Sequence, residues 1–438
     1  MAVHLEPLFE QHLDEIKRRV TAALEASGFD GVLVLAGLPP AQPADDQHYP
    51  YKPNPQFKLW IPDPQPGCVV SFRAGSRPRL IFHRPVDFWY QPPGIPADGW
   101  CRSFDIEVVE DTSAARRAAT ATGRWALLGE RDAAWDALGT WNPPALLARL
   151  DYARAAKTPY EVECIAQASR LGARAHRAAE RAFREGASEY EVHLAYCGAV
   201  AVREEELPYN SIVAFNEHAA VLHYQRLDRS RPATRRSFLI DAGAPFRGYA
   251  SDITRTYAGG PGAFADLVSA LDGLQQRVAA GVRPGRDFRD VHLDAHLELG
   301  ALLADAGLVR STADQAVARG LTRVFFPHGI GHLLGLQVHD VGGLMAGPGA
   351  GERPRPAGHP WLRLTRDLPP GCVVTIEPGL YFIESLLAEA AGDGRRRLID
   401  WDAVEQLRGC GGIRIEDDVV ALPEGPRNLT REAFAAVS

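Results

Sequence analysis

The first half of the chain alternates between a helical pattern and short apolar runs. Between His12 and Ala26 apolar residues recur every three or four positions, which predicts an amphipathic helix. The run GVLVLAG from Gly31 and the later runs CVVSF and LIFH are typical of strands. Residues 44–67 are dense in proline and aromatic side chains, which excludes a regular helix and predicts a long ordered loop. The pattern therefore indicates an α/β domain.

The second half begins with two long helical patterns and then changes to strands. Residues 161–183 and 190–205 carry apolar positions at helical spacing. From Ser211 onward, β-rich runs are separated by glycines and prolines. We predict an α+β fold here, with helices packed on a largely antiparallel sheet. The expected domains are residues 1–155, the smaller α/β domain, and residues 156–438.

The composition is that of a globular protein with a small substrate. The chain has 438 residues, 46% hydrophobic and 24% charged, and is too long for one ordinary core. A formal net charge of -7 without a dense basic face argues against nucleic acid as a partner. No apolar run approaches ~18 residues, and the N-terminal stretch carries acids where a signal peptide is apolar. The six cysteines form no CxxC pair, so we expect free thiols, no membrane contact and a cytoplasmic location.

Candidate chemistry begins in the segment SFLIDAGAPFRGYASDITRTYAG. Two β-rich runs flank Pro245 and Gly248, which predicts a hairpin centred on Phe246 and Arg247. In that register, Asp241 and Asp252 are direct cross-strand partners, with Cβ atoms roughly 5 Å apart. Like charges at that separation repel unless cations bridge them, so the pair favours a metal site. The alternative is a pair of solvated turn acids.

Three further segments supply similar side chains. The segment FFPHGIGHLLGLQVHDVGG carries His328, His332 and His339, and its glycines exclude the helical zinc motif that an i, i+4 histidine pair suggests. Glu377 and Glu416 each follow a β-branched run that ends in Ile-Glu. Structural histidines and surface glutamates are the alternatives for single residues. Together, four carboxylates and one imidazole predict a site for two divalent cations, and this donor set suits Mn²⁺, Fe²⁺ or Co²⁺, although the order of affinities alone would favour zinc.

These segments resemble a known family. The two aspartates, the HGIGH and LGLQVHD segment, TIEPGLYF and GIRIEDD are similar to the five-ligand signature of the pita-bread metallopeptidases. Within that family the chain resembles the bacterial prolidases, the Xaa-Pro dipeptidases. The likeness extends to DDQHYPYKPNPQFKLWIP and LPYNSIVAFNEHAAVLHY, and so covers almost the full length. It implies a pita-bread catalytic domain over residues 156–438.

The resemblance also implies roles for individual residues. Two metal ions, most commonly Mn²⁺, are bound by the five ligands Asp241, Asp252, His332, Glu377 and Glu416, with Asp252 and Glu416 bridging. His223 and His339 are expected as catalytic histidines, and Glu377 as the proton-transferring residue. Substrate contacts are expected from Tyr209, Leu222 and Arg363, of which Arg363 meets the substrate carboxylate.

The expected reaction is hydrolysis of the imide bond in dipeptides with C-terminal proline, by a hydroxide held between the two metals. Such a nucleophile can also attack phosphorus, so a side activity on organophosphate triesters is physically plausible. One alternative is an aminopeptidase P, which shares all five ligands and cleaves longer Xaa-Pro peptides. A second, from another class, is a catalytically silent pita-bread binding module. The resemblance also implies a homodimer, for which the loops DDQHYPYKPNPQF and VDFWYQP are suitable contacts.

Overall fold

The structure is a computed structural model that describes residues 5–119, 122–349 and 351–437. The chain forms two compact units. The N-terminal unit comprises Met1–Arg154, Thr158–Glu161 and Gly347–Gly351, and the C-terminal unit comprises Ala155–Lys157, Val162–Ala346 and Glu352–Ser438. None of the described helices is both long enough and apolar enough to cross a membrane.

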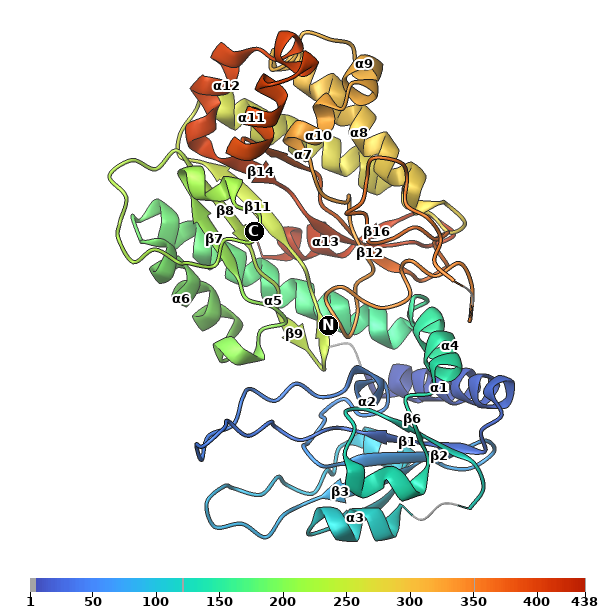
Figure 1. The fold of residues 1–438 in the computed structure, drawn as a ribbon. Helices are drawn as coiled ribbons and strands as arrows, with labels where there is room; N and C mark the ends of the chain where they lie inside the picture. The colour runs from blue at the N-terminus through green and yellow to red at the C-terminus, as the bar shows by residue number, and fades with distance from the viewer. Residues whose placement is uncertain (1–4, 120–121, 350, 438) are drawn as a thin grey trace. The chain divides into compact units, whose positions relative to one another are not determined.

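The N-terminal unit is an α/β domain, as predicted, and is drawn from blue to cyan in Figure 1. Its six strands lie in the order β4-β3-β2-β1-β5-β6, and β1 is antiparallel to β2 but parallel to β5. The strands are β1 (Gly31–Leu35), β2 (Val69–Arg73), β3 (Arg79–His83), β4 (Asp105–Val109), β5 (Trp125–Leu128) and β6 (Thr140–Trp141). The helices are α1 (Leu5–Ser27), α2 (Pro55–Lys58), α3 (Thr112–Ala118) and α4 (Pro144–Arg154).

In helix α1, the apolar residues that recur at helical spacing form the face that packs against the rest of the domain. Its buried residues Leu13, Ile16, Val20 and Leu24 recur at the spacing of one helical face. Burying such a side chain fully contributes about 1.5–3 kcal/mol, so this stripe fixes which face of the helix packs inward. The predicted helix is confirmed, although it begins seven residues before His12. The predicted loop over 44–67 is also confirmed, apart from the single turn of α2.

The C-terminal unit is α+β, with every strand pair antiparallel among the described residues. Its strands are β7 (Ile212–Phe215), β8 (Ser237–Asp241), β9 (Pro245–Phe246), β10 (Tyr249–Ala250), β11 (Thr254–Ala258), β12 (Val373–Ile376), β13 (Gly379–Tyr381), β14 (Gly412–Arg414), β15 (Asp417–Val420) and β16 (Arg427–Asn428). Its helices are α5 (Pro159–Arg184), α6 (Glu189–Val200), α7 (Ala263–Ala280), α8 (Phe288–Asp305), α9 (Ala313–Ala318), α10 (Leu321–Phe325), α11 (Glu384–Ala391), α12 (Trp401–Leu407) and α13 (Leu429–Ala436).

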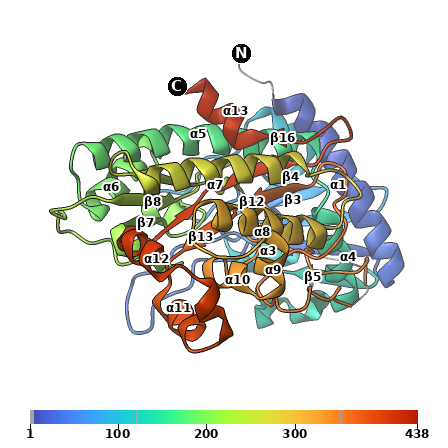
Figure 2. The same cartoon turned by 90° about the horizontal axis from the view of Figure 1, so that it is seen from above.

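Helices cover the strands of this unit and enclose its core. Helix α7 packs on β11, β12 and β14, while α6 packs on β7 and α13 on β15. In Figure 2, α5 and α7 run along the strands that they cover. Isolated bridges join the separate ladders, pairing Thr254 with Glu416 and Leu333 with Val374. These bridges bring the four chain segments that carry the candidate ligands to one place.

The hairpin after β8 differs from the prediction by its register. β9 and β10 pair Phe246 with Tyr249, so the two turn residues are Arg247 and Gly248, both with positive φ (48° and 83°). That conformation belongs to a two-residue hairpin turn and favours glycine at the second position. Asp241 therefore lies opposite Thr254, not Asp252. The predicted direct pairing of the two aspartates is wrong by two residues, a shift that leaves both on the same face.

Candidate metal centre

The five predicted ligands converge in the C-terminal unit. Asp252, His332 and Glu416 are buried, and one ligand atom from each lies within 4.8 Å of the other two. His332 Nε2 is 3.3 Å from Asp252 Oδ2 and 3.8 Å from Glu377 Oε1. Asp241 is linked to them through the Tyr209 hydroxyl, whose oxygen lies 2.8 Å from Asp241 Oδ1 and 2.5 Å from Asp252 Oδ1, so that it can donate its hydrogen to either carboxylate. The aspartates thus meet despite the error in the predicted register.

Each ligand is placed by the end of a strand or by a close approach of backbone. Asp241 ends β8, Glu377 follows β12, and Glu416 lies between β14 and β15. The segment around His332 is not helical, which confirms the prediction from its glycines. A Cβ at Gly331 would collide with the carbonyl oxygen of Thr375, so only glycine lets this segment approach β12. The His332 amide then donates to Thr375 Oγ1 at 3.1 Å, which fixes the ligand beside the strand.

The electrostatics of the cluster fit divalent cations. Burial and the neighbouring carboxylates raise the pKa of Glu416 well above its usual range, and burial raises the pKa of Asp241. Burial also raises the pKa of Glu377, to about 7. Burial acts the other way on His332, but the hydrogen bond and charge of Asp252 raise its pKa to about 9. Ionising all of these carboxyl groups together is unfavourable, and divalent cations bound among them would lower their pKa values.

Side chains around the ligands provide hydrogen bonds that sequence patterns did not predict. The buried Arg414 donates from Nη2 to Asp241 Oδ2 at 2.7 Å and from Nη1 to the Tyr381 hydroxyl at 3.0 Å. Thr254 Oγ1 donates to Glu416 Oε2 at 2.7 Å. Such contacts orient metal ligands and tune their affinity. In the sequence, Arg414 stands out only as a charged residue between two isoleucines, Ile413 and Ile415.

Asp418 is a second residue that the sequence patterns missed. It is fully buried and accepts from the Asp252 amide, with its two carboxylate oxygens 3.2 and 3.3 Å from that nitrogen. Ser169 on α5 donates to Asp418 Oδ2 at 3.0 Å. The Asp418 carboxyl therefore holds the backbone at Asp252 in place. In the sequence it is the last acid of an acidic triplet, which resembles a solvated surface run.

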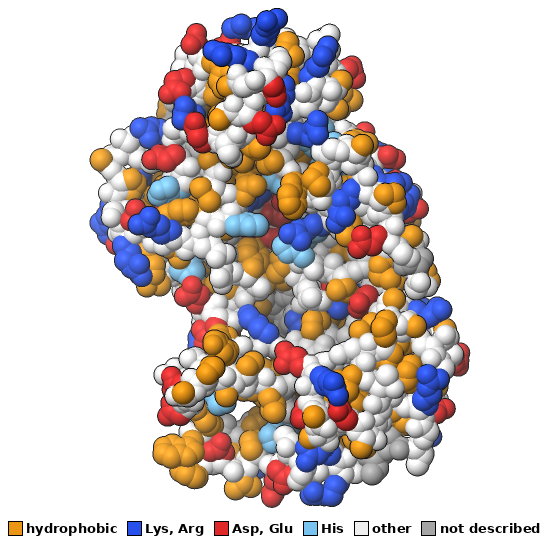
Figure 3. Space-filling view, viewed as in Figure 1, with side chains coloured by type: hydrophobic (Ala, Val, Ile, Leu, Met, Phe, Trp, Pro, Cys, Tyr) orange, Lys and Arg blue, Asp and Glu red, His pale blue; other side chains and the backbone are white. Residues whose placement is uncertain are grey.

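The predicted catalytic and substrate residues lie at different depths. The ring of His339 is 4.2 Å from that of His332 between centroids, and burial lowers its pKa to about 3, with the His332 and Arg363 charges acting in the same direction. Arg363 is exposed, and so is His223, whose charge also lowers the pKa of His339. Leu222 is half-buried in the turn before His223. Figure 3 shows histidine side chains beside acidic and basic ones on this face of the unit.

Tyr209 lies deeper than a residue that only lines a side-chain pocket. Its hydroxyl bonds two of the predicted metal ligands, and burial together with the nearby aspartates raises its pKa well above the usual range. The phenol therefore stays protonated and serves as a donor to the carboxylates.

The family of the chain follows from these features and from its relatives. The model of metallopeptidase family M24 matches residues 163–422, and the model of the Xaa-Pro dipeptidase N-terminal domain matches residues 7–152. The chain belongs to metallopeptidase family M24, in the group that carries the Xaa-Pro dipeptidase N-terminal domain. It is 49% identical to the Xaa-Pro dipeptidase of Stenotrophomonas maltophilia (strain K279a), over 98% of each chain. It is 48% identical to that of Xanthomonas campestris pv. campestris (strain 8004), over 99% of each.

Solved structures share the fold. Aminopeptidase P from Escherichia coli, with the inhibitor Pro-Leu, matches with a TM-score of 0.73 and 24% identity, over 97% of this chain and 98% of that one. The zinc-substituted form of the same enzyme, in complex with product, matches with a TM-score of 0.71. The predicted pita-bread fold is therefore confirmed. Membership of the family also implies a dinuclear centre of divalent metal ions, which the converging carboxylates and imidazole fit.

Proposed function

We propose that the chain is an Xaa-Pro dipeptidase that hydrolyses the bond before a C-terminal proline. The observation that carries the proposal is the convergence of all five ligand side chains in a chain related over its full length to Xaa-Pro dipeptidases. A catalytically silent module would not need to retain this buried excess of carboxylates. The two cations, which we propose to be Mn²⁺, would activate a water molecule and polarise the scissile carbonyl.

The proton transfers fall to Glu377. Its carboxyl is a group of the kind that takes a proton from water and returns it to a leaving nitrogen. It lies 3.8 Å from His332, at the edge of the ligand cluster. Glu377 takes the proton of the attacking water and delivers it to the proline nitrogen, which leaves as a secondary amine.

We propose that two histidines stabilise the oxyanion. His339 packs on the ring of His332, and its pKa of about 3 keeps the imidazole neutral with one N–H to donate. His223 is exposed nearby and supplies the second donor. A well-placed donor of this kind lowers a hydrolytic barrier by about 3 kcal/mol.

Recognition of a dipeptide rests on Arg363 and its neighbours. Arg363 is exposed and close enough to His339 for its charge to lower the pKa of that ring. A guanidinium there clamps the free carboxylate of the terminal proline and leaves no room for a further residue. We propose that Tyr209 and Leu222 contact the amino-terminal residue of the substrate. Hydrolysis of organophosphate triesters is proposed as a side activity of the same centre.

The direct test compares a dipeptide with a tripeptide. Purified protein loaded with Mn²⁺ is given Ala-Pro or Ala-Pro-Ala, and the released proline or Pro-Ala is measured. We expect rapid release from the dipeptide and little from the tripeptide. Preference for the tripeptide would favour aminopeptidase P activity instead. A protein that binds no divalent ion and leaves both substrates intact would contradict enzymatic function altogether.

We also propose a homodimer and a cytoplasmic location. The loop after β3 exposes Val86, Phe88, Trp89 and Tyr90, each with at least 64% of its surface accessible. Contiguous apolar side chains of this kind mark protein interaction sites. Light scattering is expected to give twice the chain mass, and Phe88→Ser with Trp89→Ser to reduce it to one chain. The six cysteines are all free, which suits a reducing compartment.

A further inference from the structure

A second cluster of potential metal ligands lies in the C-terminal unit, apart from the dinuclear centre. It consists of His292 and His296 on α8 and His359 in the loop before β12, and is called the histidine cluster below. One ring nitrogen from each histidine lies within 4.8 Å of the other two. The ring centroids are 4.6 to 4.7 Å apart in all three pairs. The cluster shares no residue with the five ligands of the catalytic centre.

The geometry of α8 creates the first half of the site. His292 and His296 are four residues apart, so their side chains project from the same helical face one turn apart. The third imidazole comes from a different chain segment and approaches both. Its Nδ1 lies 2.8 Å from His292 Nε2. Ligands on one tetrahedral zinc ion are about 3.4 Å apart, since each Zn–N bond is about 2.0–2.1 Å, so small side-chain rotations suffice.

The hydrogen bonds inside the cluster are incomplete. His296 Nδ1 lies 2.9 Å from Thr322 Oγ1, and when this nitrogen donates, Nε2 is left with a lone pair. Among the described residues, His296 Nε2 and His292 Nδ1 are buried atoms with no hydrogen-bond partner. The His296 side chain is fully buried. An imidazole oriented by a hydroxyl on one nitrogen and free on the other is the arrangement found in metal sites.

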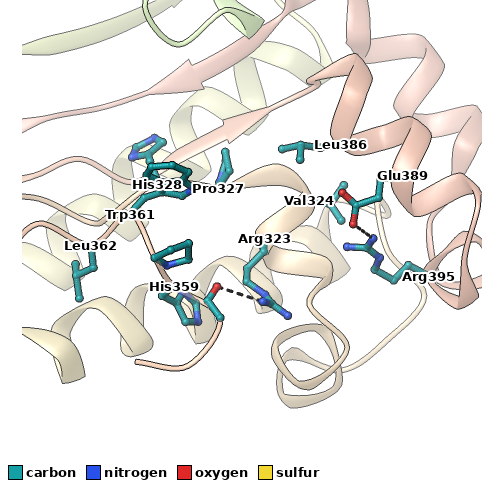
Figure 4. A pocket seen from close by; sticks show the side chains of 12 residues that line it. Arg323, Val324, Pro327, His328, His359, Trp361, Leu362, Leu386, Glu389 and Arg395 are labelled. Atoms are coloured by element: carbon teal, nitrogen blue, oxygen red, sulfur yellow. Dashed lines mark hydrogen bonds and ion pairs between the residues drawn. The ribbon is translucent and has the colours of Figure 1, made fainter. Parts of the chain in front are cut away.

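Access to the cluster comes from a cavity of about 300 Å³ that His359 lines. Figure 4 shows His359 and Arg323 on its wall, with Trp361 and Leu362 nearby. Arg323 donates to the Gly358 carbonyl at 3.2 Å. The cavity gives a cation a path to the half-buried His359 and gives room for a water molecule as a further ligand. Burial lowers the pKa of His292 to about 2 and that of His296 to about 3, so both rings are neutral and able to coordinate.

We propose that the histidine cluster binds one zinc ion through His292, His296 and His359, with water from the cavity as the fourth ligand. Three neutral imidazoles and an open position form a common zinc donor set, and imidazole suits zinc better than it suits the hard cations of carboxylate sites. The positive charge of Arg323 opposes a metal ion at this place, and its hydrogen bond to the Gly358 carbonyl holds that charge on the loop beside His359. The site is independent of the proposed dipeptidase activity.

Zinc content tests the proposal. Full-length protein is saturated with zinc chloride, desalted and analysed for zinc per chain. We expect His359→Gln to hold one zinc fewer than the unmodified chain, while His48→Gln, an exposed histidine outside both sites, holds the same number. The dinuclear centre is intact in both variants, so their difference reports the histidine cluster alone. Circular dichroism confirms that each variant is folded.

Anomalous diffraction at the zinc edge provides a test that needs no variant. Crystals of the zinc-saturated chain are expected to show a peak within bonding distance of the three imidazoles, in addition to the density at the five catalytic ligands. Equal zinc in His359→Gln and the unmodified chain, with no anomalous peak among the three imidazoles, would overturn the proposal. If His359→Gln fails to fold, the presence or absence of that peak decides the question.

Discussion

The C-terminal unit buries two kinds of ionisable side chain, and they avoid uncompensated charge in opposite ways. In the metal centre, burial and neighbouring carboxylates raise the pKa of Glu416, while the hydrogen bond and charge of Asp252 raise that of His332 to about 9 against its own burial. In the buried histidines His176, His292 and His296, burial lowers the pKa to about 3, about 2 and about 3. The buried acids avoid uncompensated charge when cations bind beside them, whereas the buried histidines avoid it by staying neutral.

Because of this difference, metal ions should determine the activity of the centre, whereas pH should determine the stability contributed by the buried histidines. Cations at the five predicted ligands determine whether the centre can act, because Asp241, Glu377 and Glu416 otherwise resist ionisation, while His332 stabilises the charge of Asp252. The neutral His176 lies outside both proposed metal sites and responds to acid instead, because protonation of its buried ring is unfavourable in the folded chain. Mutations that alter each region in turn therefore have distinguishable effects.

The largest effect is expected from Asp252→Asn, which removes a carboxylate bonded to Tyr209 and paired with His332. The amide keeps the shape but loses the charge that holds the cations. We expect kcat/KM for Ala-Pro to fall by about 10⁴-fold, the size of loss seen when an essential carboxylate in a catalytic group becomes an amide. The control is Asp294→Asn, an exposed aspartate on α8. Normal proline release with a full metal complement in Asp252→Asn would remove it from the ligand set.

Substitution of Arg414 tests how far the chain's own positive charge stabilises the buried carboxylates when metal is absent. This buried guanidinium pairs with Asp241 at 2.7 Å, so Arg414→Met leaves an uncompensated acid when metal is absent. We expect the metal-free protein to lose about 3–5 kcal/mol of unfolding free energy in urea. Mn²⁺ should recover part of that loss, because cations then neutralise Asp241.

The matched control for Arg414 is Arg310→Met, because Arg310 is largely exposed and pairs with Asp400 at the surface. Its cost should be small, with or without metal, because solvent screens an exposed ion pair. Equal costs for the two substitutions would mean that Arg414 does not balance the acids.

Arg363→Met probes the recognition of the substrate carboxylate outside the ligand cluster. Loss of a charged pair with the terminal proline is expected to raise KM for Ala-Pro by about 10²-fold, since charge-assisted hydrogen bonds contribute about 1.5–3 kcal/mol. The number of bound metal ions should not change, which distinguishes this variant from Asp252→Asn. Steady-state kinetics on Ala-Pro measure the effect, with the exposed Arg226→Met as the control. An unchanged KM would assign the carboxylate to another residue.

Sequence patterns predicted the strands and a set of candidate ligands that lie close together in the structure, but not the contacts that support them. The acids Asp241 and Asp252 could be predicted because they interrupt apolar β-rich runs. Their register could not, because it depends on the left-handed backbone at Arg247 and Gly248, and an alternating pattern allows shifts of two residues. The bond between Arg414 and Asp241 joins residues 173 positions apart. Nothing local in the sequence specifies that pairing.

Secondary structure shows the same limit. The helix predicted over 190–205 ends at Val200, because Ala201 adopts a left-handed conformation with φ 62°. Glu204 to Glu206 then form a separate short turn. The apolar pattern predicts which residues pack, but a chain reversal depends on the backbone conformation of single residues.

The smallest effect is expected from His176→Gln, which concerns proton binding without metal. His176 is fully buried on α5, its Nε2 lies 3.0 Å from the Ala242 carbonyl, and Arg177 and Arg255 lie near enough to lower its pKa further, to about 3. The unfolded chain binds a proton there near pH 6.5 and the folded chain does not. Stability is therefore present above pH 6.5 and is lost as pH falls toward 3, by about 2 kcal/mol between pH 7 and pH 5. Glutamine keeps a neutral hydrogen-bond donor and does not titrate. The unfolding free energy of His176→Gln, measured in urea, should therefore fall by about 2 kcal/mol less between pH 7 and pH 5 than that of the unmodified chain. The exposed control is His48→Gln. If His176→Gln and His48→Gln lose the same unfolding free energy between pH 7 and pH 5, His176 does not bind protons differently in the folded and unfolded chains.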